Sequence, residues 1–335
     1  MPLVLFKASL KPPPHAFNRC RDMNAAEQRT VVEPEKKGTG ESTPYGTHAI
    51  SLLRRRLWGY GHLKVVRHPR WQRRWQKLRR SVVRRVVLPF VRIEPPFDIE
   101  AWSGIRLRLD PRNNTTDRQA LVSEKPWTSE DEAAIQRAIA SVPDERFVYV
   151  DVGANVGIYA AFVASLAREA HVGFVPLCIE PQPILVERLK VNLAFAGVDA
   201  DAVRAVGTGP KDAVVPMDVS ASVNLGKSSM LAERVANARS IIEVPCRPLA
   251  ALVAEAALPR IDLMKVDIEG LEVPTLSAFF SDVSERLFPR TILIEVAHDR
   301  NGAIDALLLE QGYRRTYVDP LDAIYERRPA FVDPS

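Results

Sequence analysis

Two patterns of apolar positions alternate along the chain from about residue 97 onward. Short runs rich in β-branched and aromatic residues predict strands, and longer segments with an apolar residue every three or four positions predict helices. Strands are expected at 105–110, 147–152, 174–180, 202–206, 241–246, 261–267 and 291–296. Helices are expected at 129–140, 156–168, 184–196, 249–255, 271–280 and 303–311. Strands that alternate with helices predict a mostly parallel sheet with helices on both faces.

Two local signals refine this pattern. The run Ser129-Glu-Asp-Glu132 is typical of a capping box and predicts the start of the first helix. Near the end of the chain, 313–318 and 323–327 flank Asp319-Pro320, which indicates a hairpin. That hairpin is expected to add an antiparallel strand to the sheet.

The first 92 residues follow neither pattern. Residues 1–50 contain scattered prolines without an apolar period, so we expect them to be disordered. Residues 51–92 are expected to form a basic helical segment and residues 93–335 the main folded domain. The segment 54–92 holds 14 of the 46 Lys and Arg residues and no acid, whereas the rest of the chain has 32 bases against 41 acids. A basic segment therefore precedes an acidic body.

The basic segment contains an amphipathic pattern at 70–88. Trp71, Trp75, Leu78, Val82 and Val86 recur at helical spacing, with arginines and lysines between them. One hypothesis is a helix docked on the catalytic domain with a solvated basic face. A second is attachment to an anionic membrane surface. Nucleic-acid binding is disfavoured, because no recognisable nucleic-acid-binding motif accompanies the charge.

Cysteine content and hydropathy bear on the compartment. The three cysteines, Cys20, Cys178 and Cys246, lie far apart and form no CxxC pair, which argues against a disulfide scaffold and a zinc site. The apolar start MPLVLF is too short for a signal peptide, and no uncharged run approaches the roughly 18 residues that span a bilayer. We expect a cytoplasmic protein, or one attached peripherally to the inner membrane.

The stretch VYVDVGANVGIYA, 148–160, has the form of a strand-to-helix turn. Gly153 would permit the tight turn, Gly157 would let the helix pack closely, and Asn155 stands where a dinucleotide motif has its middle glycine. The carboxylate of Asp151 would repel a pyrophosphate but attract the ammonium and sulfonium of S-adenosylmethionine. The turn therefore favours a cationic nucleoside over NAD.

Glu180 ends the next predicted strand, in CIEP. An acid at this place can accept hydrogen bonds from both hydroxyls of a ribose. The alternative is a surface acid that caps the helix beginning near Pro183.

Four blocks resemble FkbM-family methyltransferases: VYVDVGANVGIYA, CIEPQPILVERLKVNLAFAG (178–197), IDLMKVDIEGLEVPTL (261–276) and ILIEV (292–296). The KVDIEG block is the most specific of them. The resemblance spans about 97–327 and implies a class I, Rossmann-like α/β fold with a seven-stranded sheet. It also implies S-adenosylmethionine as cofactor and O-methylation of a sugar, glycan or secondary-metabolite hydroxyl. By position, it assigns the cofactor to Asp151, Gly153, Asn155, Gly157, Glu180 and Val206, and the acids after the fourth strand to Asp267 and Glu269.

Methyl transfer requires alignment of donor and acceptor, and a hydroxyl acceptor must also lose its proton or be polarised by a metal. If the chain stays extended after the fourth strand, Asp267 and Glu269 share one face. Beside Lys265, they can act as a base, a divalent-metal pair or a clamp on the acceptor. Alternatively, Glu269 caps the next helix and Lys265 pairs with an acid. His298 is a second candidate base, ranked below Asp267.

Other functions are weaker fits to the sequence. ASVNLGKSS, 221–229, resembles a phosphate-binding loop but begins with alanine instead of the glycine that such a loop requires, so we expect a loop over the active site. A nicotinamide-dependent oxidoreductase on a similar sheet is one rival hypothesis. A non-catalytic, methyltransferase-like binding module is the other. The acceptor is expected to be a small molecule or a glycan.

Overall fold

The structure is a computed structural model that describes residues 95–122, 128–219, 225–299 and 301–327. These ranges belong to one compact unit of the chain, Ser42–Ser335. The predictions for 1–50, for 51–92 and for the amphipathic segment 70–88 lie outside the described residues. None of the helices in the described ranges combines the length and the hydropathy that a membrane span requires.

A seven-stranded sheet forms the centre of the domain, in the order β11-β12-β10-β9-β3-β4-β5. The strands are β3 (Arg146–Val152), β4 (Gly173–Ile179), β5 (Val203–Arg204), β9 (Leu263–Val266), β10 (Thr291–Glu295), β11 (Tyr313–Val318) and β12 (Asp322–Arg327). The pairs from β5 to β10 are parallel, and β12 runs antiparallel to both β10 and β11. The expected mostly parallel sheet with its closing hairpin is confirmed.

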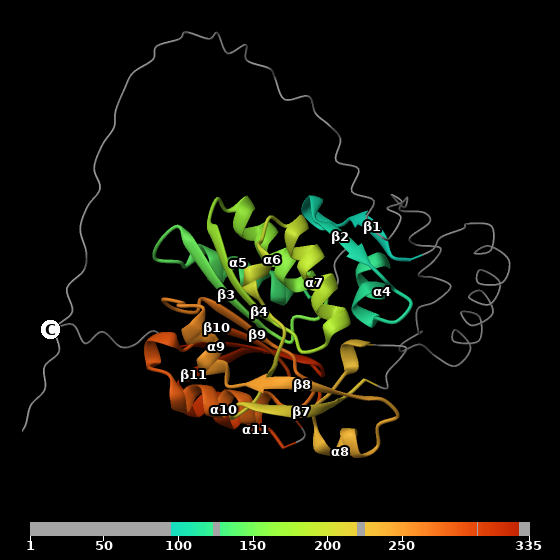
Figure 1. The fold of residues 1–335 in the computed structure, drawn as a ribbon. Helices are drawn as coiled ribbons and strands as arrows, with labels where there is room; N and C mark the ends of the chain where they lie inside the picture. The colour runs from blue at the N-terminus through green and yellow to red at the C-terminus, as the bar shows by residue number, and fades with distance from the viewer. Residues whose placement is uncertain (1–94, 123–127, 220–224, 300, 328–335) are drawn as a thin grey trace, which may run out of the picture. The chain divides into compact units, whose positions relative to one another are not determined.

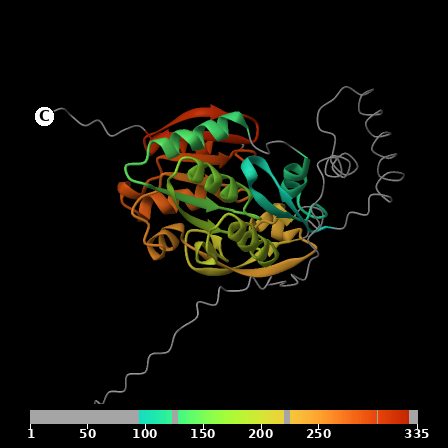
Figure 2. The same ribbon diagram turned by 90° about the horizontal axis from the view of Figure 1, so that it is seen from above.

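Helices cover both faces of this sheet (Figure 1). One face carries α5 (Ser129–Ala140), α6 (Ile158–Glu169) and α7 (Pro183–Phe195), and the other carries α9 (Leu249–Glu255), α10 (Glu272–Asp282) and α11 (Ala303–Glu310). In the view from above, the green helices of the first group lie over the sheet (Figure 2). The alternation of β3 explains both layers, because Phe147 and Tyr149 join the first core while Val148 and Val150 join the second.

The first predicted helix has the predicted length but a different cap. Thr128, not Ser129, is the N-cap, and its side chain accepts a hydrogen bond from the Asp131 N–H at 3.1 Å. The Asp131 carboxylate in turn accepts from the Thr128 N–H at 3.2 Å. The capping box therefore exists one residue earlier than expected, because aspartate serves here in place of glutamate.

A second, three-stranded sheet departs from the sequence prediction. It contains β6 (Gly207–Thr208), β7 (Ala213–Asp218) and β8 (Ile241–Arg247), so the strand predicted at 241–246 does not belong to the central sheet. Pro216 and Pro245 lie in β7 and β8, and both strands alternate exposed positions with half-buried or buried ones. Prolines within the strands and one exposed strand face are typical of a small peripheral sheet and unusual in a central one.

The described chain begins with a hairpin that packs against α7. It consists of β1 (Phe97–Glu100) and β2 (Arg106–Leu109), followed by α4 (Thr115–Val122). Asn192 of α7 fastens it, because its side chain accepts from the Arg108 N–H at 2.7 Å and donates to the Val156 carbonyl at 2.7 Å. The hairpin is thereby tied to the loop that follows β3.

Candidate active site

The glycine turn after β3 is shaped by close contact with the neighbouring strand. Gly153 has φ +88°, and a Cβ at this position would lie 1.9 Å from the carbonyl oxygen of Asp267. The N–H groups of Gly153 and Ala154 both donate to the carbonyl of Ile179 at 2.9 Å. Glycine is required here for both its backbone angles and its missing side chain.

Asn155 takes the left-handed conformation, with φ +53°, which asparagine tolerates better than most residues. Its N–H donates to one Glu180 oxygen at 2.9 Å, and its side-chain oxygen accepts from the Asn114 amide at 2.7 Å. The other Glu180 oxygen accepts from the Gln182 N–H at 2.9 Å. The two peptide N–H groups therefore fix the orientation of the Glu180 carboxylate.

Glu180 is buried, and burial raises its pKa to about 7, against the opposing effect of the two N–H donors. A carboxylate offers about four acceptor positions, and the peptide groups occupy two of them. Two positions remain for other hydroxyl donors. The carboxylate caps no helix, because its partners belong to the loops after β3 and β4.

A cavity of about 60 Å³ lies beyond the carboxyl ends of β3, β4 and β9. Six of the residues assigned from sequence line it: Gly153, Asn155, Glu180, Val206, Asp267 and Glu269. Residues of 225–230 line it as well, where Ser228 accepts a hydrogen bond from the Gln182 side chain at 2.8 Å and Met230 lies against Gly207. The described part of the loop expected over the active site therefore contributes to this cavity.

Asp151 and Gly157 are not among the lining residues. Gly157 begins α6 with φ +78°, and a Cβ there would lie 2.6 Å from a methyl carbon of Leu189, so it lets α6 pack against α7. Asp151 is completely buried, near the hydroxyl of Tyr149 and opposite Lys265 of β9. Burial raises the pKa of Asp151 to about 6, while the nearby Lys265 opposes the rise.

The chain does not stay extended after β9, so Asp267 and Glu269 do not share one face. The strand ends at Val266, and Glu269 has φ +55°. Asp267 pairs with Lys265 at 3.0 Å. A turn forms because Glu272 accepts hydrogen bonds from the N–H groups of Ile268 and Gly270, both at 3.1 Å. Glu272, not Glu269, thus satisfies the backbone at the start of α10.

Glu269 instead joins a basic residue and a histidine. One of its oxygens lies 3.1 Å from the Arg234 guanidinium and 3.2 Å from Nε2 of His298. Nε2 of His298 also lies 3.9 Å from Glu295. The imidazole, about two-fifths exposed, is therefore positioned by carboxylates from the ends of β9 and β10.

Glu295 and Asp322, the last residue of β10 and the first of β12, are acids near His298 and Lys265 that the sequence analysis did not identify. They lie opposite each other in the pairing of β10 with β12. Burial, followed by the charges of Asp267 and Glu269, raises the pKa of Glu295 to about 8. Burial raises the pKa of Asp322 to about 6. An acid that ends a buried strand, in ILIE, was the available signal, the same one that marked Asp151 and Glu180.

No group of three or more His, Cys, Asp and Glu side chains in the described ranges is arranged to hold a metal ion.

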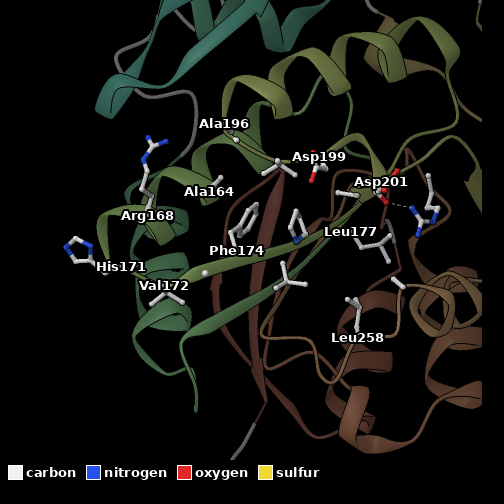
Figure 3. A pocket seen from close by; sticks show the side chains of 18 residues that line it. Ala164, Arg168, His171, Val172, Phe174, Leu177, Ala196, Asp199, Asp201 and Leu258 are labelled. Atoms are coloured by element: carbon white, nitrogen blue, oxygen red, sulfur yellow. Dashed lines mark hydrogen bonds between the residues drawn. The ribbon is translucent and has the colours of Figure 1, made fainter. Parts of the chain in front are cut away.

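A larger cavity of about 780 Å³ lies elsewhere, along the amino-terminal half of β4 (Figure 3). Its lining includes Arg168, His171, Phe174, Leu177 and Leu258. The strand edge is open because β5 pairs only with the last two residues of β4. Pro176, which has no N–H, suits such an edge. Ligands of parallel sheets bind beyond the carboxyl ends of the strands, so this cavity lies at the wrong end of β4 for the chemistry.

Comparison with known proteins identifies the domain. The profile of the methyltransferase FkbM domain matches residues 151–315. Methyltransferase sdnD of Sordaria araneosa is 25% identical over 206 residues, which cover 52% of this chain and 76% of that protein. Methyltransferase 1 of Beauveria bassiana is 24% identical over 156 residues, which cover 41% of this chain and 60% of that protein.

Solved structures with a similar arrangement include two bacterial methyltransferases. Ribosomal protein L11 methylase of Lactobacillus delbrueckii subsp. bulgaricus matches with a TM-score of 0.33 and 13% identity, over 60% of this chain and 81% of that one. Precorrin-6y C5,15-methyltransferase of Geobacter metallireducens matches with a TM-score of 0.35 and 14% identity, over 60% and 89%.

Proposed function

This chain belongs to the FkbM methyltransferase family, and on that premise we propose that it transfers the methyl group of S-adenosylmethionine to a hydroxyl of a sugar, a glycan or another small metabolite. The observation that carries the proposal is the buried Glu180 beside the glycine turn. Its carboxylate faces the cavity with two acceptor positions free. Two neighbouring hydroxyls of a ribose match this arrangement.

The lining fits a nucleoside once the covering segment withdraws. Nucleoside-sized ligands need cavities of about 300–1,000 Å³, more than the present cavity offers. The Met230 thioether and the Ser228 hydroxyl occupy part of that space, beside Gly207 and Gln182. Both belong to one short segment, so a local shift of 225–230 opens the site while the sheet stays in place.

The acidic groups suit the charge of the cofactor. When bound, S-adenosylmethionine supplies an electrophilic methyl group on a sulfonium. Asp267 lines the cavity and pairs with Lys265 at 3.0 Å, and Asp151 precedes Gly153 by two residues in the turn. Both carboxylates favour a cation, whereas the pyrophosphate of NAD would meet like charge. The nicotinamide hypothesis is not favoured for this reason.

We assign proton removal from the acceptor to the pair of Glu269 and His298. Glu269 lines the cavity and holds Nε2 of the imidazole at 3.2 Å. An imidazole oriented by a carboxylate is a common general base near neutral pH. Asp267 forms an ion pair with Lys265, so we assign it the role of orienting the Lys265 side chain and balancing its charge.

A direct test is calorimetry of the full-length protein with S-adenosylmethionine and, separately, with NAD. We expect binding of the first and none of the second. Transfer of labelled methyl groups into an extract of sugars and small metabolites then distinguishes an enzyme from a non-catalytic module. Binding of NAD alone, or cofactor binding without transfer into any extract, would contradict the proposal.

A further inference from the structure

Asn114 is a completely buried polar residue between the start of α4 and the glycine turn. Its side-chain oxygen accepts hydrogen bonds from the N–H groups of Thr116 at 2.9 Å and Asp117 at 3.4 Å, so it caps α4. Its amide nitrogen donates to the side-chain oxygen of Asn155 at 2.7 Å. Because two peptide N–H groups face the oxygen, the orientation of the amide is fixed and its donor must face Asn155.

Capping alone does not explain an asparagine at this position. Serine and aspartate cap helices equally well, but neither carries an amide that can also donate to Asn155. Asn155 has φ +53°, a conformation that is sparsely populated by residues with a side chain. Its N–H donates to Glu180 at 2.9 Å. A contact that holds the Asn155 side chain therefore keeps this N–H directed at the Glu180 carboxylate.

The loop that carries Asn114 is held from two sides. Asp117, which is completely buried, forms an ion pair with Arg188 of α7. The carbonyl of Asn113 accepts a hydrogen bond from the N–H of Leu225 at 2.7 Å, and Leu225 lines the cavity. The loop thus contacts both the glycine turn and the cavity wall opposite it, and it provides the kind of fixed support that a preorganised site requires.

We propose that Asn114 is a positioning residue of the cofactor site, which orients through Asn155 the N–H that holds Glu180. The inference rests on the proposed methyltransferase function and adds a residue from outside the region that matches the family, 151–315. Asn155 lines the cavity and Asn114 does not, so Asn114 acts through its neighbour. The rival role is purely structural, with Asn114 only docking α4 on the domain.

A double-mutant cycle on the full-length protein, read by calorimetry with S-adenosylhomocysteine, separates the two roles. Asn114→Ser keeps a helix cap, but its hydroxyl is too short to reach Asn155. Loss of one buried hydrogen bond predicts binding weaker by about threefold to tenfold. In Asn155→Gly, which tolerates the left-handed backbone, the same substitution should change the affinity by less than about twofold. Equal effects in both backgrounds, or no effect beside Asn155, would overturn the inference.

Hydrogen exchange without cofactor gives a second readout. The N–H groups of Gly153, Ala154 and Asn155 donate to Ile179 and Glu180. We expect these amides to exchange at least about threefold faster in Asn114→Ser, while those of β3 exchange as in the parent. Unchanged exchange at the turn would overturn the inference whatever calorimetry shows. Failure of the parent to bind S-adenosylhomocysteine would instead count against the proposed methyltransferase function, since the exchange measurement needs no cofactor.

Asp299→Ala is the matched control for a lost helix cap. The Asp299 carboxylate accepts hydrogen bonds from the N–H groups of Ala303 at 2.8 Å and Ile304 at 3.0 Å, at the start of α11. This variant should melt at a lower temperature but bind S-adenosylhomocysteine as the parent does. An equal loss of affinity in Asp299→Ala and Asn114→Ser would overturn the inference, because general destabilisation would explain both. Asn114→Thr, which also retains a cap, carries the same prediction if the serine variant does not fold.

Discussion

The cofactor side of the cavity, at the ends of β3 and β4, and the acceptor side, at the ends of β9, β10 and β12, differ in how their polar groups are satisfied. On the cofactor side, backbone N–H groups hold Glu180, and glycine and asparagine adopt positive φ angles to place them. On the acceptor side, side chains meet side chains, and carboxylates such as Glu295 keep unsatisfied oxygens. The first side is therefore preorganised by its backbone, whereas the second is an arrangement of side chains in which Glu269 and Glu295 both lie near His298.

The largest effect is expected from a substitution that disturbs the backbone on the cofactor side. In Gly153→Ala, the new Cβ would overlap the Asp267 carbonyl, and positive-φ strain of about 1–3 kcal/mol adds to the steric cost. We expect loss of cofactor binding and a lower melting temperature. Gly197→Ala is the matched control, because Gly197 also has φ +80° but nothing lies within 4 Å of its missing Cβ. Equal effects of the two substitutions would show that only backbone strain matters at Gly153.

The next largest effect is expected on turnover, when the proposed general base on the acceptor side is removed. Removing a general base lowers turnover by about 10²–10⁴-fold, so His298→Asn and Glu269→Gln should each do so with cofactor affinity retained. His171→Asn, at an exposed histidine outside the site, should leave turnover unchanged. If Asp267→Asn abolishes turnover while His298→Asn does not, the base is Asp267.

The smallest effect is expected on the pH dependence of stability, which tests the burial of Glu295. The folded-state pKa of Glu295, about 8, lies above its ordinary value, so the folded protein binds the proton more tightly than the unfolded chain. Its stabilising contribution is present below pH about 4.5 and is lost as the pH rises through about 8. Glu295→Gln stays neutral and should raise the melting temperature at pH 8.5 relative to the parent, with little difference at pH 4.5. A difference that is larger at pH 4.5 would contradict the burial of an unbalanced charge at this position.

Much of the fold follows from sequence because its signals are local. The central strands correspond to short apolar runs in the sequence. The residues that form the turn at Gly153 lie in one contiguous stretch. The strand at 241–246 was predicted as a strand, but local pattern does not say which sheet a strand joins. The predicted capping box was one residue too late, because local pattern did not distinguish Thr128 and Asp131 from the expected pair, Ser129 and Glu132.

The acceptor side was only partly predictable because it depends on register. Asp267 and Glu269 were identified from one short motif, yet their divergence depends on the positive φ of Glu269, which glutamate rarely adopts. The pairing of Glu295 with Asp322 joins residues from two strands that α11 and β11 separate along the chain. The proposed roles of all these residues, and of the basic segment 70–88, stay predictions until measured.

Parallel calorimetric titrations of S-adenosylmethionine into Glu180→Gln and Glu269→Gln test most directly whether the two sides act separately. Loss of a charged acceptor for the ribose hydroxyls should weaken binding to Glu180→Gln by at least about tenfold, or roughly 1.4 kcal/mol. Glu269→Gln should bind within about twofold of the parent, since its carboxylate serves the acceptor side. Unchanged affinity in Glu180→Gln, or an equal loss in both variants, would contradict the account.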